Sequence, residues 1–89
     1  MGRSRQPRPE RLAEKLREIR LKLRLSQPQM YERLKDSGTP LYVGYISSFE
    51  SGEKVPSLRV ILKYARIAGI TMELIVDDAL NLPEKLPNG

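Results

Sequence analysis

The stretch Tyr45–Pro56, YISSFESGEKVP, contains the predicted end of one helix and the start of the next. Ile46 and Phe49 lie three residues apart and share one helical face, while the serines between them face away. Gly52 stands where a left-handed residue closes a helix, and Pro56 stands where a second helix can begin. The pattern fits a helix that reads a nucleic-acid groove, and it also fits any small helix that packs on a core.

The composition indicates a single small domain without catalytic chemistry. The chain has 89 residues, of which 39% are hydrophobic, and the apolar residues recur at helical spacing. It contains no cysteine and no histidine, which excludes a disulfide, a thiolate-bound metal and the usual general base. Asp77 and Asp78 follow a short apolar segment and are interpreted as solvated residues beyond a helix end, not as a metal pair. We therefore expect no enzyme activity, no metal and no cofactor.

The net charge of +5 is unevenly distributed along the chain. Residues 1–36 contain eleven Lys or Arg and five acids, whereas residues 67–89 contain one Lys and four acids. A basic half indicates a polyanionic partner, although a solvated charged helix face is the common alternative. No apolar run approaches the length that spans a membrane, and no signal-peptide pattern opens the chain, so we expect a cytoplasmic protein.

Three segments are predicted from these patterns. Residues 1–9 are rich in Arg and Pro and are expected to form a flexible basic arm. In this arm Arg3, Arg5 and Arg8 could contact a phosphate backbone, or the arm could be a solvated leader. Residues 10–79 are expected to form the folded domain. The C-terminal tail, residues 80–89, should be irregular, with its leucines packed back on the domain or on a partner subunit.

Five short helices are predicted within the domain, each from local start and stop signals. Ser26 and Gln29 provide a capping box for the second helix, and Gly69 provides a stop for the fourth. Thr39 and Pro40 would start the third helix. Gly44 weakens its interior, and it either allows close approach of another backbone or marks a later start at Tyr42. The expected ranges are 10–24, 26–35, 39–51, 57–68 and 71–76.

Four segments in this order resemble the helix-turn-helix domain of Cro and phage repressors, the XRE-type regulators. They are residues 16–20 (LREIR), 25–27 (LSQ), 45–52 (YISSFESG) and 56–57 (PS). The resemblance covers residues 10–78 and implies an all-α, five-helix lambda-repressor-like fold. It also implies a homodimeric transcriptional repressor that binds double-stranded DNA at two half-sites, with the third helix in the major groove.

The resemblance also implies roles for individual residues. Gln27, at the start of the second helix, would contact a phosphate. Arg20 and Glu50 would form a structural ion pair between the first and third helices. The remaining DNA-binding positions are those that face base edges, Val43, Gly44, Ser47 and Ser48, and those near the backbone, Tyr45 and Lys54.

Two features depart from the family pattern. The turn between the second and third helices is about five residues longer than the family spacing, and Tyr31 replaces the usual alanine. The longer turn could bring Thr39, Leu41 or Tyr42 to the groove. The base-facing set also lacks Arg, Asn and Gln, which favours readout through thymine methyl groups, serine hydroxyls and DNA shape.

A protein-binding role is the alternative. An antitoxin or adaptor of the same fold would bind a toxin or another protein through one of its surfaces. The acidic tail with Leu80, Leu82 and Leu86 would be the natural contact for that partner.

Overall fold

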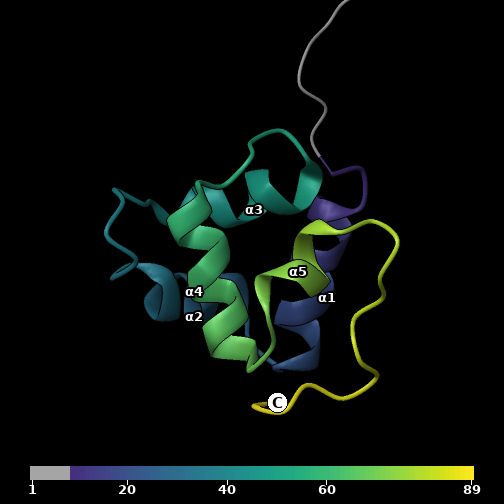
Figure 1. The fold of residues 1–89 in the computed structure, drawn as a ribbon. Coiled ribbons are helices and arrows are strands. Elements are labelled where there is room, and N and C mark those ends of the chain that lie inside the picture. The colour runs from purple at the N-terminus through teal and green to yellow at the C-terminus, as the bar shows by residue number, and fades with distance from the viewer. Residues whose placement is uncertain (1–8) are drawn as a thin grey trace, which may run out of the picture.

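The computed structural model describes residues 9–89, and this part of the chain forms five α-helices and no strand (Figure 1). The all-α prediction is therefore confirmed for the described residues. The predictions for Arg3, Arg5 and Arg8 lie outside the described range. Within that range, no helix is long and apolar enough to cross a membrane. The helices are α1 (Leu12–Lys22), α2 (Gln27–Leu34), α3 (Val43–Ser51), α4 (Leu58–Ala68) and α5 (Met72–Val76).

Most helix ends follow the local signals in the sequence. The backbone N–H of Gln29 donates to Ser26 Oγ at 3.2 Å, and the N–H of Ser26 donates to Gln29 Oε1 at 2.8 Å, which completes the capping box. Gly52 ends α3 with φ 84°, and Gly69 ends α4 with φ 81°. Because glycine adopts this left-handed conformation without strain, both predicted stops are confirmed.

The start of α3 corrects the prediction that Thr39 caps this helix. The helix begins at Val43, and Tyr42 is the extended residue before it, as the later-start alternative proposed. Leu41 is only 8% exposed and belongs to the core cluster, so the longer turn does not bring it to the surface. Thr39 contacts α4 instead, with its hydroxyl 3.4 Å from Ser57 Oγ. Burial of Leu41 therefore takes precedence over the local signal for a helix at residue 39.

The core lies where α1, α4 and α5 meet the inner faces of α2 and α3. Ile46 and Phe49 are the buried residues of α3, as their spacing predicts. Sixteen buried hydrophobic side chains of residues 9–89 form one cluster. Its members are Leu12, Leu16, Ile19, Met30, Leu34, Leu41, Ile46, Phe49, Val60, Ile61, Tyr64, Ala65, Ala68, Ile75, Leu82 and Leu86.

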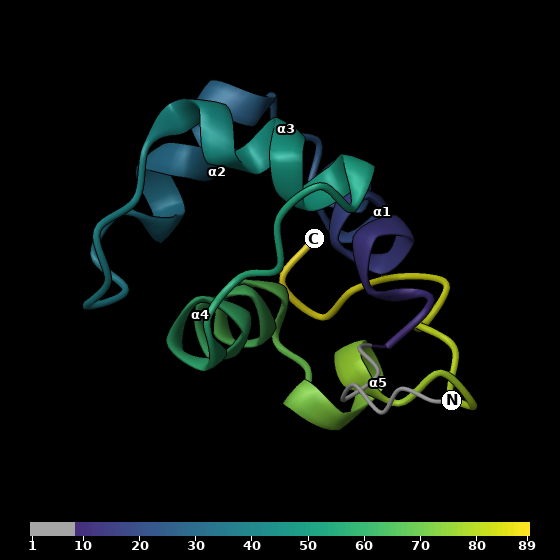
Figure 2. The same ribbon diagram turned by 90° about the horizontal axis from the view of Figure 1, so that it is seen from above.

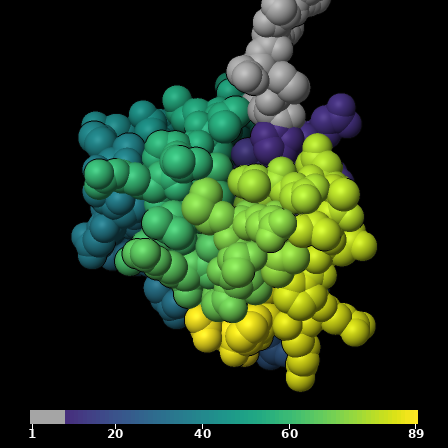
Figure 3. Space-filling model, viewed as in Figure 1, coloured from purple at the N-terminus to yellow at the C-terminus, as the bar shows by residue number. Residues whose placement is uncertain are grey.

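The C-terminal segment, residues 80–89, packs against the domain. Leu82 and Leu86 are 8% and 5% exposed and join the core, so these leucines fold back on their own chain. Lys22 Nζ donates to the carbonyls of Pro83 and Glu84 at 2.9 and 2.7 Å. The chain end lies between α1 and α4 in Figure 2, and the segment continues the packed surface in Figure 3. The tail therefore offers neither Leu82 nor Leu86 to a partner.

Asp78 has a structural role that the sequence interpretation missed. Its carboxylate accepts the backbone N–H groups of Glu10 at 2.8 Å and Arg11 at 3.0 Å. These hydrogen bonds cap the start of α1, where Arg11 makes no side-chain cap of its own. They also lower the pKa of Asp78, with the bond from Arg11 contributing most. Asp78 is exposed beyond the end of α5, as the sequence predicts, and the capping of α1 is a further role that the sequence did not indicate.

Lys15 is fully buried and ties α1 to α5. Its Nζ donates to the carbonyls of Leu74 and Asp77, each at 2.8 Å, at the C-terminal end of α5. A cation at this end of a helix interacts favourably with the unpaired carbonyls. Burial lowers the pKa of Lys15, and the neighbouring charge of Arg11 adds to this effect. The only sequence signal was its position beside Leu12 and Leu16 on the inner face of α1.

Candidate nucleic-acid interface

The outer face of α3 is the surface on which most of the predicted base-facing residues lie. In Figure 1, α3 lies along one edge of the molecule, with the other helices on one side of it. Val43 and Tyr42 are 49% and 61% exposed, and Gly44 and Ser47 are exposed as well. The structure thus brings Val43, Gly44 and Ser47 together on one open surface, and Tyr42, one of the residues that the longer turn could bring to the groove, lies at its N-terminal end.

An ion pair between Arg20 and Glu50 links α3 to α1. Arg20 Nε lies 2.7 Å from Glu50 Oε2, and Arg20 Nη2 lies 3.0 Å from Oε1, so the guanidinium binds the carboxylate in bidentate fashion. Only 11% of the Arg20 side chain and 5% of the Glu50 side chain are exposed. The hydrogen bond to Glu50 is the largest effect on Arg20 and raises its pKa. Arg20 and Glu50 therefore form the pair that the family resemblance implies.

Two further contacts complete this network. Arg20 Nη1 donates to the carbonyl of Leu25 at 3.0 Å, in the connection between α1 and α2. Gln27 Nε2 donates to Glu50 Oε1 at 3.3 Å. The amide of Gln27 is thus engaged with α3 in the described structure, whereas the resemblance assigns it to a phosphate. Side chains of α1 and α2 therefore converge on Glu50 and link both helices to α3.

An aromatic cluster forms beside the outer face of α3. The Tyr45 ring is half-buried and meets the Tyr42 ring edge-on, with a centroid distance of 5.2 Å. Phe49 lies on the inner side at 6.1 Å, and Lys54 Nζ lies 4.4 Å from the Tyr45 centroid. The cation–π contact holds the exposed amine of Lys54 beside α3. Tyr45 therefore orients both Tyr42 and Lys54.

The serines of α3 differ in how free their hydroxyls are. Ser51 Oγ donates to the carbonyl of Ser48 at 3.1 Å and accepts the N–H of Glu53 at 3.3 Å. Ser48 is half-buried, and its hydroxyl donates to the carbonyl of Gly44 at 3.5 Å, a long hydrogen bond. Within residues 9–89, Ser47 is exposed and its hydroxyl makes no hydrogen bond. Ser48 is therefore less available than the sequence prediction supposed.

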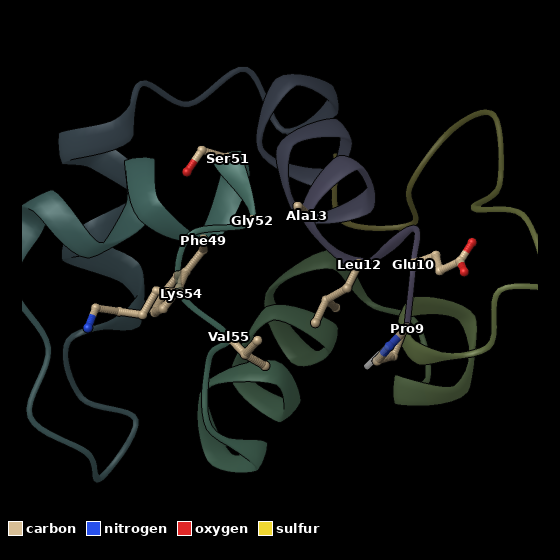
Figure 4. Close-up of a pocket in the computed structure, with 9 residues that line it drawn as sticks. All are labelled: Pro9, Glu10, Leu12, Ala13, Phe49, Ser51, Gly52, Lys54 and Val55. Atoms are coloured by element: carbon tan, nitrogen blue, oxygen red, sulfur yellow. The ribbon is translucent and has the colours of Figure 1, made fainter. Parts of the chain in front are cut away.

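A pocket of about 290 Å³ lies between the start of α1 and the end of α3 (Figure 4). In Figure 4 the carboxylate of Glu10 and the amine of Lys54 point in different directions, so the two charges do not converge. No group of three possible metal-ligating side chains occurs in the described residues. The pocket therefore presents no acid–base pair and no ligand set for a metal. Its lining residues are Pro9, Glu10, Leu12, Ala13, Phe49, Ser51, Gly52, Lys54 and Val55.

The geometry of this face thus combines an uncharged outer helix surface, an adjacent exposed cation and a buried ion pair that orients the helix. Comparison of the chain with protein-family models, curated proteins and solved structures gives no match.

Proposed function

We propose that this chain is a DNA-binding transcriptional repressor of the helix-turn-helix class, in which α2 and α3 form the binding unit. The observation that carries the proposal is the way in which α3 is held against the domain. The inner face of α3 is buried, its only carboxylate is held by Arg20, and its outer face is exposed and uncharged. Such a helix can enter a groove without an unpaired negative charge facing the phosphates.

The distribution of charge and the order of the helices support the same proposal. The chain carries a net charge of +5, and the exposed amine of Lys54 is held next to α3 by the Tyr45 ring. Phosphate contacts of this kind supply affinity and fix the orientation of a domain on the duplex. A homodimer would place two copies of α3 about one helical turn of DNA apart, roughly 34–36 Å.

A salt titration tests the proposal. Binding to a duplex from the region upstream of the gene should weaken steeply as salt rises, with a slope near 0.9 for each phosphate neutralised. Lys54→Ala should lower this slope by about one. Lys85→Ala is the matched control, because Lys85 is an exposed lysine in the C-terminal segment, and it should leave the slope unchanged. Absence of binding to any duplex at low salt, or a flat salt response, would contradict the proposal.

Deletion of residues 1–8 tests the arm separately. If Arg3 and Arg5 contact phosphates or a minor groove, the shortened protein should bind all duplexes more weakly and with a smaller slope. Unchanged affinity and slope would assign the arm no part in binding.

The alternative of a toxin-binding or adaptor protein predicts instead that a partner protein co-purifies. The tail surface suggested for that partner is reduced, since Leu82 and Leu86 are buried in the chain itself.

A further inference from the structure

The N-terminal end of α3 carries an exposed apolar surface. Tyr42 and Val43 are adjacent and are 61% and 49% exposed. The next residue, Gly44, leaves the helix backbone open, because no atom lies within 4 Å of the position that a Cβ would occupy. A helical glycine is less stable than alanine, and nothing inside the described structure requires this one. Gly44 therefore leaves open space in which another molecule can come close to the helix backbone.

The hydrogen-bonding capacity of this surface is small. The hydroxyl of Ser51 is used within the chain, and that of Ser48 faces the carbonyl of Gly44. Ser47 on the outer face of α3 and Tyr42 at its start are exposed, and their hydroxyls make no hydrogen bond within residues 9–89. Neither can make the bidentate contacts by which Arg recognises guanine or Asn recognises adenine.

The apolar character of this surface selects one feature of the major groove. Thymine is the only base that presents an apolar group there, its C5-methyl, and apolar side chains contact that methyl. In the docking geometry of this class, the N-terminal residues of the recognition helix are the ones that reach base edges. Tyr42 and Val43 lie at that end of α3, and an open Gly44 permits close approach of the backbone.

We infer that Val43 and the ring of Tyr42 recognise thymine by packing on its C5-methyl group. This inference rests on the proposed function. The protein would prefer duplex DNA with thymine at the positions that face the start of α3. The Tyr42 ring already packs edge-on against Tyr45 in the free protein, with 5.2 Å between the ring centroids.

The surface is too small for a protein partner. A specific protein–protein interface buries about 800 Å² on each partner, and two adjacent exposed residues provide far less.

Replacement of thymine by uracil tests the inference, because uracil pairs identically and lacks only the methyl group. A preferred duplex is first selected from a random pool, and each thymine in it is then replaced by deoxyuridine. At one or more positions the affinity should fall about fourfold, the value for one buried methyl group. Val43→Ala should bring the thymine-to-uracil affinity ratio at that position close to one, because the shorter alanine side chain no longer packs on the methyl group.

The matched control is Leu21→Ala. Leu21 is 50% exposed on α1, close to the 49% of Val43, and its replacement should leave the ratio as in the unmodified protein. If the protein selects and binds a duplex but no uracil substitution changes its affinity, the inference is wrong and the proposed function stands. If no duplex is bound at low salt, the proposed function fails and the inference fails with it. A Val43→Ala effect on self-association instead of on the ratio would also overturn the inference.

Discussion

Removal of Glu50 is the perturbation that most directly tests how α3 is held. Glu50 accepts hydrogen bonds from Arg20 Nε at 2.7 Å, from Arg20 Nη2 at 3.0 Å and from Gln27 Nε2 at 3.3 Å. Glu50→Ala removes all of these acceptors and leaves the Arg20 side chain, which is only 11% exposed, without its counter-ion. Breaking a buried pair by removing one partner costs about 3–5 kcal/mol.

The size of the domain makes this loss visible. At roughly 0.05–0.15 kcal/mol per residue, a chain of this length has a free energy of unfolding of roughly 4–13 kcal/mol. The loss is therefore a large share of the total, and Glu50→Ala and Arg20→Ala should each unfold the domain or nearly do so. Glu53→Ala is the matched control, because Glu53 is exposed in the turn after α3, and its effect should stay within about 0.5 kcal/mol.

Urea denaturation followed by circular dichroism measures these changes. The midpoint should fall while the slope against urea stays constant, which would identify a change in stability and not in the extent of unfolding. A double-mutant cycle with Arg20→Met and Glu50→Leu, which remove the charged groups but keep much of the side-chain volume, isolates the pairwise term, which should be about 0.5–3 kcal/mol for groups in contact. A coupling energy near zero would refute the reasoning, and the orientation of α3 would then require another cause.

Three further predictions follow from particular contacts. Gly44→Ala should stabilise the domain by about 0.4–1 kcal/mol, because an added methyl group meets no atom within 4 Å. The same variant should bind DNA more weakly, and stronger binding in a titration would contradict the role given to Gly44. Because hydrogen bonds lower the pKa of Asp78 below its ordinary 3.8, the stability that it contributes is present above that pH and is lost as the pH falls through the lowered value. Acid denaturation of Asp78→Asn should therefore show a smaller fall in this range than the unmodified protein, and an identical pH profile would remove Asp78 as a cap. Leu86→Ala should cost about 2–5 kcal/mol in thermal or urea unfolding because the side chain is 5% exposed, whereas Lys85→Ala beside it should be near neutral, and equal effects would place the segment outside the core.

Sequence alone was sufficient for the features that depend on neighbouring residues. The capping box of α2 joins Ser26 to Gln29, three residues apart, and the ends of α3 and α4 depend on single glycines. The inward position of Ile46 and Phe49 follows from helical periodicity. These interactions form within one or two turns of the chain, so the residues that specify them are adjacent in the printed sequence.

The tertiary structure decided the features that depend on distant residues. Asp78 caps α1 at Glu10, 68 residues away, and Lys15 binds the carbonyl of Leu74, 59 residues away. The start of α3 follows from the burial of Leu41, and the availability of Ser48 follows from its half-buried position. No local pattern specifies such pairings, because a charge on the inner face of a helix is tolerated only when a partner from another segment reaches it. Only the packed arrangement of the helices brings that partner within hydrogen-bonding distance.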